Sequence, residues 1–195
     1  MRIIYIVGKS SVGKDTIYKR LKEEIDVKPY VLYTTRPIRT GEEDGVNYYF
    51  LKQQEMEGYI NQNKEKVIEY RVYNTIYGPW AYATIADEQF ESEKDLLMEG
   101  TLESYNAVKE YFKNKEGVNV IPIYIEVDDG IRLERALKRE MEQENPKYEE
   151  LCRRFLADSK DFSENKILES GIKKRFNNIN LDKCVQDIVD YVSMQ

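Results

Sequence analysis

One stretch near the start of the sequence has the residue types and the spacing of a phosphate-binding loop. Residues 8–16 read GKSSVGKDT, with Gly8, Gly13 and Lys14 at the positions that such a loop requires. Glycines let the backbone curl so that successive N–H groups face an anion, and the lysine reaches the β- and γ-phosphates of a nucleotide. The residues expected to bind ATP here are Gly8, Ser10, Ser11, Val12, Gly13, Lys14, Asp15 and Thr16.

Asp15 departs from this pattern, because a serine or threonine is expected directly after the lysine. An acidic residue in the first turn of a helix is favoured by the helix dipole, so Asp15 has a purely structural interpretation. Alternatively, the Thr16 hydroxyl approaches Mg²⁺, or the Asp15 carboxylate holds the ion directly or through water, since Mg²⁺ prefers oxygen ligands. Mg²⁺ with ATP is the expected cofactor, and Asp15 and Thr16 are candidate metal ligands.

A second stretch, YTTRPIRTGEEDGVNYYF at residues 33–50, brings two arginines together with phenolic hydroxyls. Arg36 and Arg39 are three residues apart, and Tyr48 follows. Two guanidinium groups that converge on one loop can clamp a dianion, because arginine offers bidentate and permanently charged donors. For an isolated pair of arginines, solvated surface charge would be the more ordinary interpretation.

The composition narrows the class of protein. A net charge of −6, from 36 acidic and 30 basic residues, argues against a nucleic-acid partner or a membrane surface. The absence of histidine excludes imidazole acid–base catalysis, which phosphoryl transfer does not need. Cys152 and Cys184 are far apart and predict neither a disulfide framework nor a zinc site. With no apolar run of ~20 residues, we expect a cytoplasmic protein. The motif at residues 8–16 predicts small-molecule nucleotides as its partners.

The elements that must position these residues alternate between strands and helices. Apolar runs and β-formers predict strands at 3–7, 30–34, 47–51, 66–73, 95–98 and 120–127. Helical patterns predict helices at 16–25, 53–63, 102–112, 131–142, 148–163 and 181–192, and the segment 78–93 is also expected to be helical. Pro122 favours a strand end or an edge. This order predicts one α/β domain with a mostly parallel sheet flanked by helices.

The sequence resembles guanylate kinases over nearly its whole length. Residues 34–50 match the family pattern T-T-R-x-x-R-x-G-E-x-x-G-x-x-Y-x-F in full. Weaker similarity is found at Glu69 with the IYG of residues 76–78, at Arg135, Arg139 and Arg154, and at Asn178 with the NLDKC of residues 180–184. The resemblance implies a P-loop nucleoside monophosphate kinase fold: a core at 1–35 and 86–195, a small acceptor-binding subdomain at about 36–85 and a lid at about 139–154.

The resemblance also implies a reaction and the residues that perform it. The expected function is ATP-dependent, direct in-line phosphoryl transfer to a nucleoside monophosphate, with GMP or dGMP as the preferred acceptor. The implied catalytic residues are Lys14, Arg39, Arg135 and Arg139, and the further ATP-binding residues are Arg135, Arg139, Arg154 and Asn178. The implied acceptor-binding residues are Arg36, Arg39, Glu42, Tyr48, Glu69 and Tyr77, of which Glu69 would accept hydrogen bonds from N1 and N2 of guanine.

Three departures from the family pattern concern base reading and metal support. Pro79 and Leu32 stand where the family has hydroxyl side chains, and Met98-Glu99-Gly100 replaces an Asp-x-Asp, so Glu99 is the third candidate metal ligand. A kinase with another acceptor, such as a different nucleotide or a sugar phosphate, is therefore an alternative. A non-catalytic scaffold is a weaker alternative, because it would not need a triphosphate site. We expect a monomer or a homodimer.

Overall fold

The computed structural model describes residues 1–75 and 78–195. Its larger sheet has the strand order β2-β7-β1-β8-β9, with all neighbouring strands parallel. These strands are β1 (Arg2–Val7), β2 (Val27–Pro29), β7 (Asp95–Gly100), β8 (Asn119–Glu126) and β9 (Arg175–Asn177). The central strand β1 is apolar throughout Ile3–Val7 and completely buried, which is typical of a strand covered on both faces. The predicted parallel sheet is confirmed.

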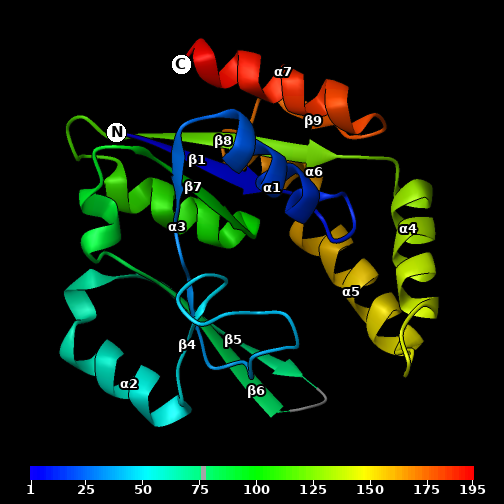
Figure 1. Ribbon diagram of the computed structural model, residues 1–195, viewed down its shortest axis with the longest axis horizontal. Helices are drawn as coiled ribbons and strands as arrows, with labels where there is room; N and C mark the ends of the chain where they lie inside the picture. The colour runs from blue at the N-terminus through cyan, green and yellow to red at the C-terminus, as the bar shows by residue number, and fades with distance from the viewer. Residues whose placement is uncertain (76–77) are drawn as a thin grey trace.

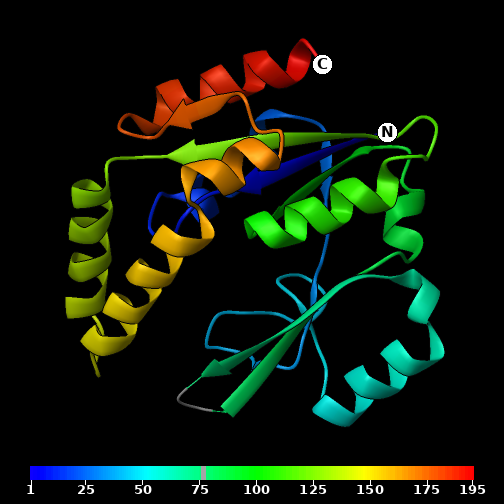
Figure 2. The same cartoon turned by 180° about the vertical axis from the view of Figure 1, so that it is seen from behind.

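Helices cover both faces of this sheet (Figures 1 and 2). Ile4 and Ile6 point to one face, where they pack in a cluster with residues of α1 (Lys14–Glu24) and α7 (Leu181–Ser193). Ile3 and Tyr5 point to the opposite face, towards α3 (Leu102–Phe112) and α6 (Glu164–Glu169). The two apolar clusters follow from the alternation of side chains along a strand.

A second, smaller sheet lies below the first in Figure 1, with the strand order β4-β3-β6-β5. It consists of β3 (Tyr33–Thr34), β4 (Tyr49–Phe50), β5 (Val67–Thr75) and β6 (Gly78–Ile85), and β5 and β6 are antiparallel. The helix α2 (Gln53–Gln62) buries Met56 against Ala83 and Ile85 of this sheet, and the 3-10 helices η1 (Lys64–Lys66) and η2 (Glu88–Glu91) complete the region.

Tyr30 anchors the small sheet to the connection that leads into it. Its hydroxyl donates a hydrogen bond to the Ile85 carbonyl oxygen (2.8 Å) and accepts one from the Ile85 amide (2.9 Å). Next to it, the Gln89 side chain accepts from the Val31 amide (2.8 Å) and donates to the Val31 carbonyl (3.1 Å). The two chain segments that enter and leave the small sheet are thus fastened together at one place.

Two long helices, α4 (Asp129–Met141) and α5 (Tyr148–Asp161), extend from the carboxyl ends of the core strands on one side of the molecule (Figure 1). Asp128 caps α4 by accepting a hydrogen bond from the Gly130 amide (2.8 Å). Among the described residues, no helix is long and apolar enough to cross a bilayer.

Some predictions about the elements were wrong. The segment expected to be helical from Gly78 to Glu93 forms strand β6, with only η2 helical after it. The strand expected at 30–34 is reduced to Tyr33–Thr34, and α6 and β9 were not predicted. Pro122 lies inside the sheet, but β9 pairs only with Tyr124–Glu126, so Pro122 stands where β8 has a strand neighbour on one side only.

Candidate functional site

The loop between β1 and α1 can adopt its curled conformation only with glycine at two positions. A Cβ atom on Gly8 would lie 2.5 Å from the Ile125 carbonyl oxygen, and one on Gly13 would lie 2.4 Å from Nδ2 of Asn178. Gly13 also has φ 95°, which is strained for any other residue. The buried Asn178 side chain donates to the Val12 carbonyl oxygen (2.8 Å). Asn178 therefore stabilises the conformation of the loop through its hydrogen bond to the loop backbone.

Lys14 begins α1 and lies folded across the loop. Its ammonium group donates to the carbonyl oxygens of Gly8 (2.8 Å) and Lys9 (3.1 Å). Burial lowers the pKa of Lys14, against the opposing effect of the carboxylates of Glu99 and Asp15. A positive charge thus lies within a glycine-containing loop at the start of a helix, which is an arrangement that can bind a phosphate chain.

Glu99 and Asp15 lie near this lysine. Glu99 is partly buried near the end of β7, and Asp15 is exposed in the first turn of α1. Burial, and next the charge of Asp15, raise the pKa of Glu99 to about 7. Within the described part of the chain, Oε2 of Glu99 is buried without a hydrogen-bond partner.

These two carboxylates fit a hard divalent cation. An orphaned buried carboxylate oxygen beside a second carboxylate is a site at which a cation would replace the missing partner and relieve the repulsion. Mg²⁺ is usually held by one or two protein carboxylates together with substrate phosphates and water, so the small number of donors is no objection. The described residues contain no group of three or more acidic, cysteine or histidine side chains that could form a closed metal site. Thr16 is exposed.

Of the two arginines predicted to form a clamp at residues 33–50, Arg36 is buried and Arg39 is exposed. The buried guanidinium group of Arg36 makes a bidentate ion pair with Glu42, at 3.0 and 2.7 Å. It also lies over the rings of Tyr48 (5.2 Å) and Phe50 (5.4 Å). Hydrogen bonds from Arg36 lower the pKa of Glu42, whose carboxylate also accepts from the Arg39 amide (2.8 Å). Glu42 thus orients the arginine.

Two other residues of this segment contribute differently. The Arg39 side chain is exposed, so its guanidinium is open to an anion arriving from solvent. Tyr48 is partly covered, and burial raises its pKa to about 12, so its hydroxyl remains a hydrogen-bond donor over the physiological pH range. Tyr77, which was also predicted to bind the acceptor, lies outside the described residues.

The predicted base-reading residue Glu69 lies buried on β5 and is paired with Arg71. Thr84 is a more distant partner, 3.5 Å from Oε2 of Glu69. Burial raises the pKa of Glu69, an effect that the charge of Arg71 opposes. Leu32 is buried and Pro79 is exposed, and neither offers a side-chain hydrogen bond. The Glu69–Arg71 pair was not predicted, although their separation by two residues on a strand places them on one face.

The predicted lid arginines extend from α4 and α5 towards the phosphate-binding loop. Arg139 donates to the Ser11 hydroxyl (3.3 Å), and Arg135 donates to the Asn178 carbonyl oxygen (3.0 Å). Arg154 is engaged with Glu150 at 3.3 Å. A cavity of about 50 Å³ lies between the loop and the two helices, and its lining includes Ser10, Ser11, Arg139 and Arg154. The structure thus brings together residues from distant parts of the sequence.

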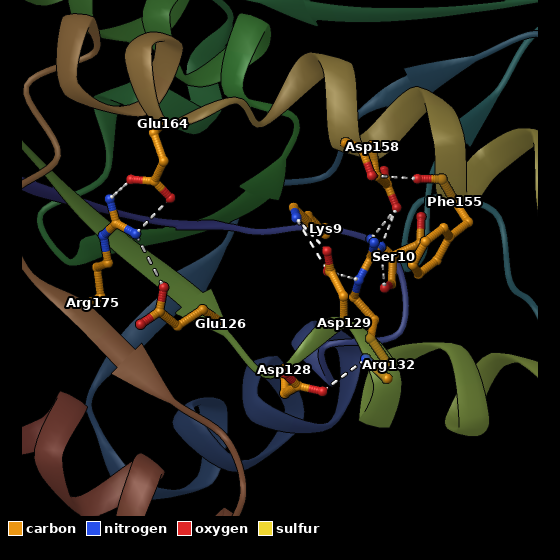
Figure 3. A network of polar contacts seen from close by, with 12 residues as sticks. Lys9, Ser10, Glu126, Asp128, Asp129, Arg132, Phe155, Asp158, Glu164 and Arg175 are labelled. Carbon is orange, nitrogen blue, oxygen red and sulfur yellow. Dashed lines mark hydrogen bonds and ion pairs between the residues drawn. The ribbon is translucent and has the colours of Figure 1, made fainter.

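Arg132 was not predicted from the sequence, and it is central to the packing between the loop, α4 and α5 (Figure 3). Its buried guanidinium donates to Asp158 of α5 (2.8 Å), to Asp129 (3.0 Å) and to the Ser10 carbonyl oxygen (3.3 Å). It also lies over the Phe155 ring, 4.2 Å from the centroid. The Asp158 carboxylate accepts from the Ser10 amide (2.8 Å), so one carboxylate joins the loop, α4 and α5.

Comparison with known proteins gives one consistent result. The family model described as guanylate kinase matches residues 1–192. A curated protein named guanylate kinase from Clostridioides difficile is 35% identical over 126 residues, which cover 64% of this chain and 60% of that protein. The chain is also 29% identical to the guanylate kinase of Clostridium tetani over 195 residues, covering 95% of this chain and 88% of the relative.

The fold has a counterpart among solved structures. The crystal structure of guanylate kinase from Anaplasma phagocytophilum superposes with a TM-score of 0.66 at 16% sequence identity. The match covers 98% of this chain and 85% of that chain. The arrangement of the two sheets, α4 and α5 is therefore that of a P-loop α/β kinase.

Proposed function

The chain belongs to the guanylate kinase family, and on this premise we propose that it transfers the terminal phosphoryl group of ATP to GMP or dGMP. The products would be ADP and the nucleoside diphosphate. The observation that carries this proposal is the loop at residues 8–16, in which Lys14 and two sterically required glycines form a cradle for phosphates at the start of α1. A non-catalytic scaffold would not need such a cradle.

On the ATP side, we assign charge neutralisation to Lys14 and the lid arginines. Phosphoryl transfer needs positioning and electrostatic stabilisation more than it needs a covalent partner or a strong base. Arg139 already contacts Ser11, and Arg135 contacts the backbone beside Asn178, so a small movement of α4 would direct their guanidinium groups at the phosphates. Arg154 would join them on closure of the lid, which also excludes water.

Asp15 and Glu99 are the residues that we propose to hold Mg²⁺ on this side, with Thr16 as an outer contact. When bound, the ion neutralises charge on the phosphate oxygens and fixes their orientation. The chain's contribution is a pair of carboxylates, one of them buried with an unpartnered oxygen. The structural interpretation of Asp15 as a helix N-terminal charge is compatible with this role.

On the acceptor side, we propose that Arg36, Arg39, Tyr48 and Tyr77 bind the phosphate of the nucleoside monophosphate. The carboxylate of Glu42 keeps the Arg36 fork in position before the acceptor arrives, which reduces the rotamer entropy lost on binding. Glu69 would accept from N1 and N2 of guanine. The small sheet with α2 would then be the acceptor-binding part, and α4 with α5 would be the lid. The cytoplasmic location and the monomeric or homodimeric state remain predictions.

A coupled assay of ADP release tests the proposal. GMP, dGMP, AMP, UMP, CMP and ribose phosphates would each be offered with MgATP, and turnover is expected with GMP and dGMP. Lys14→Ala, which removes the cation from the loop, is expected to lower turnover by at least about 100-fold. Turnover with another acceptor but not with GMP would identify a kinase of different specificity. No turnover with any acceptor and no ATP binding would refute phosphoryl transfer altogether.

A further inference from the structure

Arg71 is a charged side chain in the acceptor region to which the proposed reaction assigns no role. It lies on β5 and its side chain is 13% exposed. Its Nη1 donates a hydrogen bond to Oε1 of Glu69. Removing a guanidinium group from water is costly unless its donors find partners. In the described part of the chain, however, the buried Nε of Arg71 has none.

Aromatic rings hold the plane of this guanidinium. Its central carbon lies 5.6 Å from the centroid of the Tyr82 ring and 5.7 Å from that of Tyr73. Such cation–π contacts, together with the ion pair to Glu69, leave the side chain little rotational freedom. Arg71 is therefore a preoriented fork with at least one unused donor, beside the carboxylate that we assign to the base.

The donor and acceptor pattern of the pair is complementary to one edge of guanine. Residues two apart on a strand lie on the same face about 7 Å apart. Along the edge of guanine, the donors N1 and N2 are followed by the acceptors O6 and N7. A carboxylate accepts only, and a guanidinium donates only, so Glu69 and Arg71 side by side match these two halves in order. Arginine to O6 and N7 is also the most common specific contact that proteins make with guanine.

Two residues that stand at base-reading positions of the family pattern supply no donor in this chain. Leu32 and Pro79 have no hydrogen-bonding group. Thr84 hydrogen-bonds only weakly to Glu69, at 3.5 Å. Adenine would present an amino group at the position of O6, and this donor would face the donors of Arg71.

We propose that Arg71 determines base specificity by donating to O6 and N7 of guanine while Glu69 accepts from N1 and N2. The inference rests on the proposed function for the identity of the acceptor, and it adds a residue that selects guanine. Arg71 acts on the base and makes no contact with the phosphoryl group that is transferred.

Calorimetric titration without ATP separates this role from catalysis. The ligands are GMP and 7-deaza-GMP, which lacks the N7 acceptor. The wild-type chain is expected to prefer GMP. A bidentate pair is worth about 1–3 kcal/mol, so Arg71→Ala is expected to weaken GMP binding by about 10–100-fold and to bring the ratio of the two affinities close to one.

Two further variants keep the test decisive. Arg71→Lys retains a cation for Glu69 but not the planar fork, and it is expected to lose the preference for GMP even if Arg71→Ala does not fold. Val72→Ala is the matched control, since Val72 is on the opposite face of the same strand, and it should leave the ratio unchanged. A preference for GMP that survives in Arg71→Lys, or no binding of GMP to the wild-type chain, would overturn the inference.

The outcomes distinguish this inference from the proposed function. If GMP binds in an Arg71-dependent manner but no ADP is released in the coupled assay, base reading by Arg71 stands and phosphoryl transfer fails. If GMP is phosphorylated and the Arg71 variants keep the wild-type preference, the reaction stands and the role of Arg71 fails.

Discussion

The ion pair between Arg132 and Asp158 gives a quantitative prediction about the contacts that hold the loop at residues 8–16 against α4 and α5. The side chain of Arg132 is 1% exposed and that of Asp158 is 15% exposed. Asp158→Asn removes the negative charge but keeps an oxygen that can accept from the Ser10 amide. Breaking a buried ion pair costs about 3–5 kcal/mol, and we expect the lower value because Asp129 still contacts the guanidinium. For a chain of this size, about 3 kcal/mol corresponds to a fall in Tm of about 6–12 °C.

The assay is urea denaturation of a double-mutant cycle with Arg132→Met, Asp158→Asn and both changes together. We expect a coupling free energy of about 2 kcal/mol, because the second change costs little once the first has been made. The exposed pair Arg20 and Asp182, also 2.8 Å apart, is the matched control, and the cycle of Arg20→Met with Asp182→Asn should give a coupling below about 1 kcal/mol. If the effects at Arg132 and Asp158 add to within about 0.5 kcal/mol, the ion pair does not hold the loop against α4 and α5.

Three further predictions concern the site. Burial and the charge of Asp15 raise the pKa of Glu99 to about 7, so the folded state binds a proton at Glu99 more tightly than the unfolded state does. The free energy of unfolding should therefore fall as the pH rises from about 4.5 to 7. In urea denaturation, Glu99→Gln should therefore be more stable than the wild type by about 3 kcal/mol at pH 8 and equally stable at pH 4. A difference in unfolding free energy that is the same at both pH values would contradict the role assigned to Glu99. Arg36→Lys should raise the KM for the acceptor by about 10–100-fold and leave the KM for ATP unchanged, because a lysine cannot form the bidentate contact; equal changes in both would indicate a general disturbance. Gly13→Ala should abolish ATP binding, whereas Gly41→Ala, at φ 83° with open space around it, should cost only about 1–2 kcal/mol of unfolding free energy and leave ATP binding unchanged. Equal loss of ATP binding in the two variants would show that the Asn178 contact is unimportant.

The core of the fold could be predicted from the sequence because its signals are local. The run Ile3–Val7 followed by a glycine loop is readable as a buried strand that leads into a helix. The segment Gly78–Ile85 was misread because its alanines favour a helix, and its strand conformation depends on antiparallel pairing with β5. Strand preference of this kind is decided by neighbours that the local sequence does not contain.

The site was predictable where a motif carried the chemistry and not where a long-range contact decides it. Gly8, Gly13 and Lys14 follow from spacing alone. Arg132 sits in a highly charged helix, and only the approach of Phe155 and Asp158 from α5 makes it a buried residue. Arg71 was overlooked for a similar reason, since its relation to Tyr82 depends on the pairing of β5 with β6.

The hydroxyl of Tyr30 both donates to and accepts from Ile85, and this has a mechanical consequence. Two hydrogen bonds to one residue allow rotation but resist separation, so we expect the small sheet to swing as a rigid body about an axis that passes close to this tyrosine. The amplitude of the swing increases with distance from the axis, and it should therefore be greatest at Thr75 of β5 and Gly78 of β6, at the opposite end of the strand pair from Ile85. The buried hydroxyl of Tyr30 would in this way be the pivot about which the small sheet moves relative to the larger sheet.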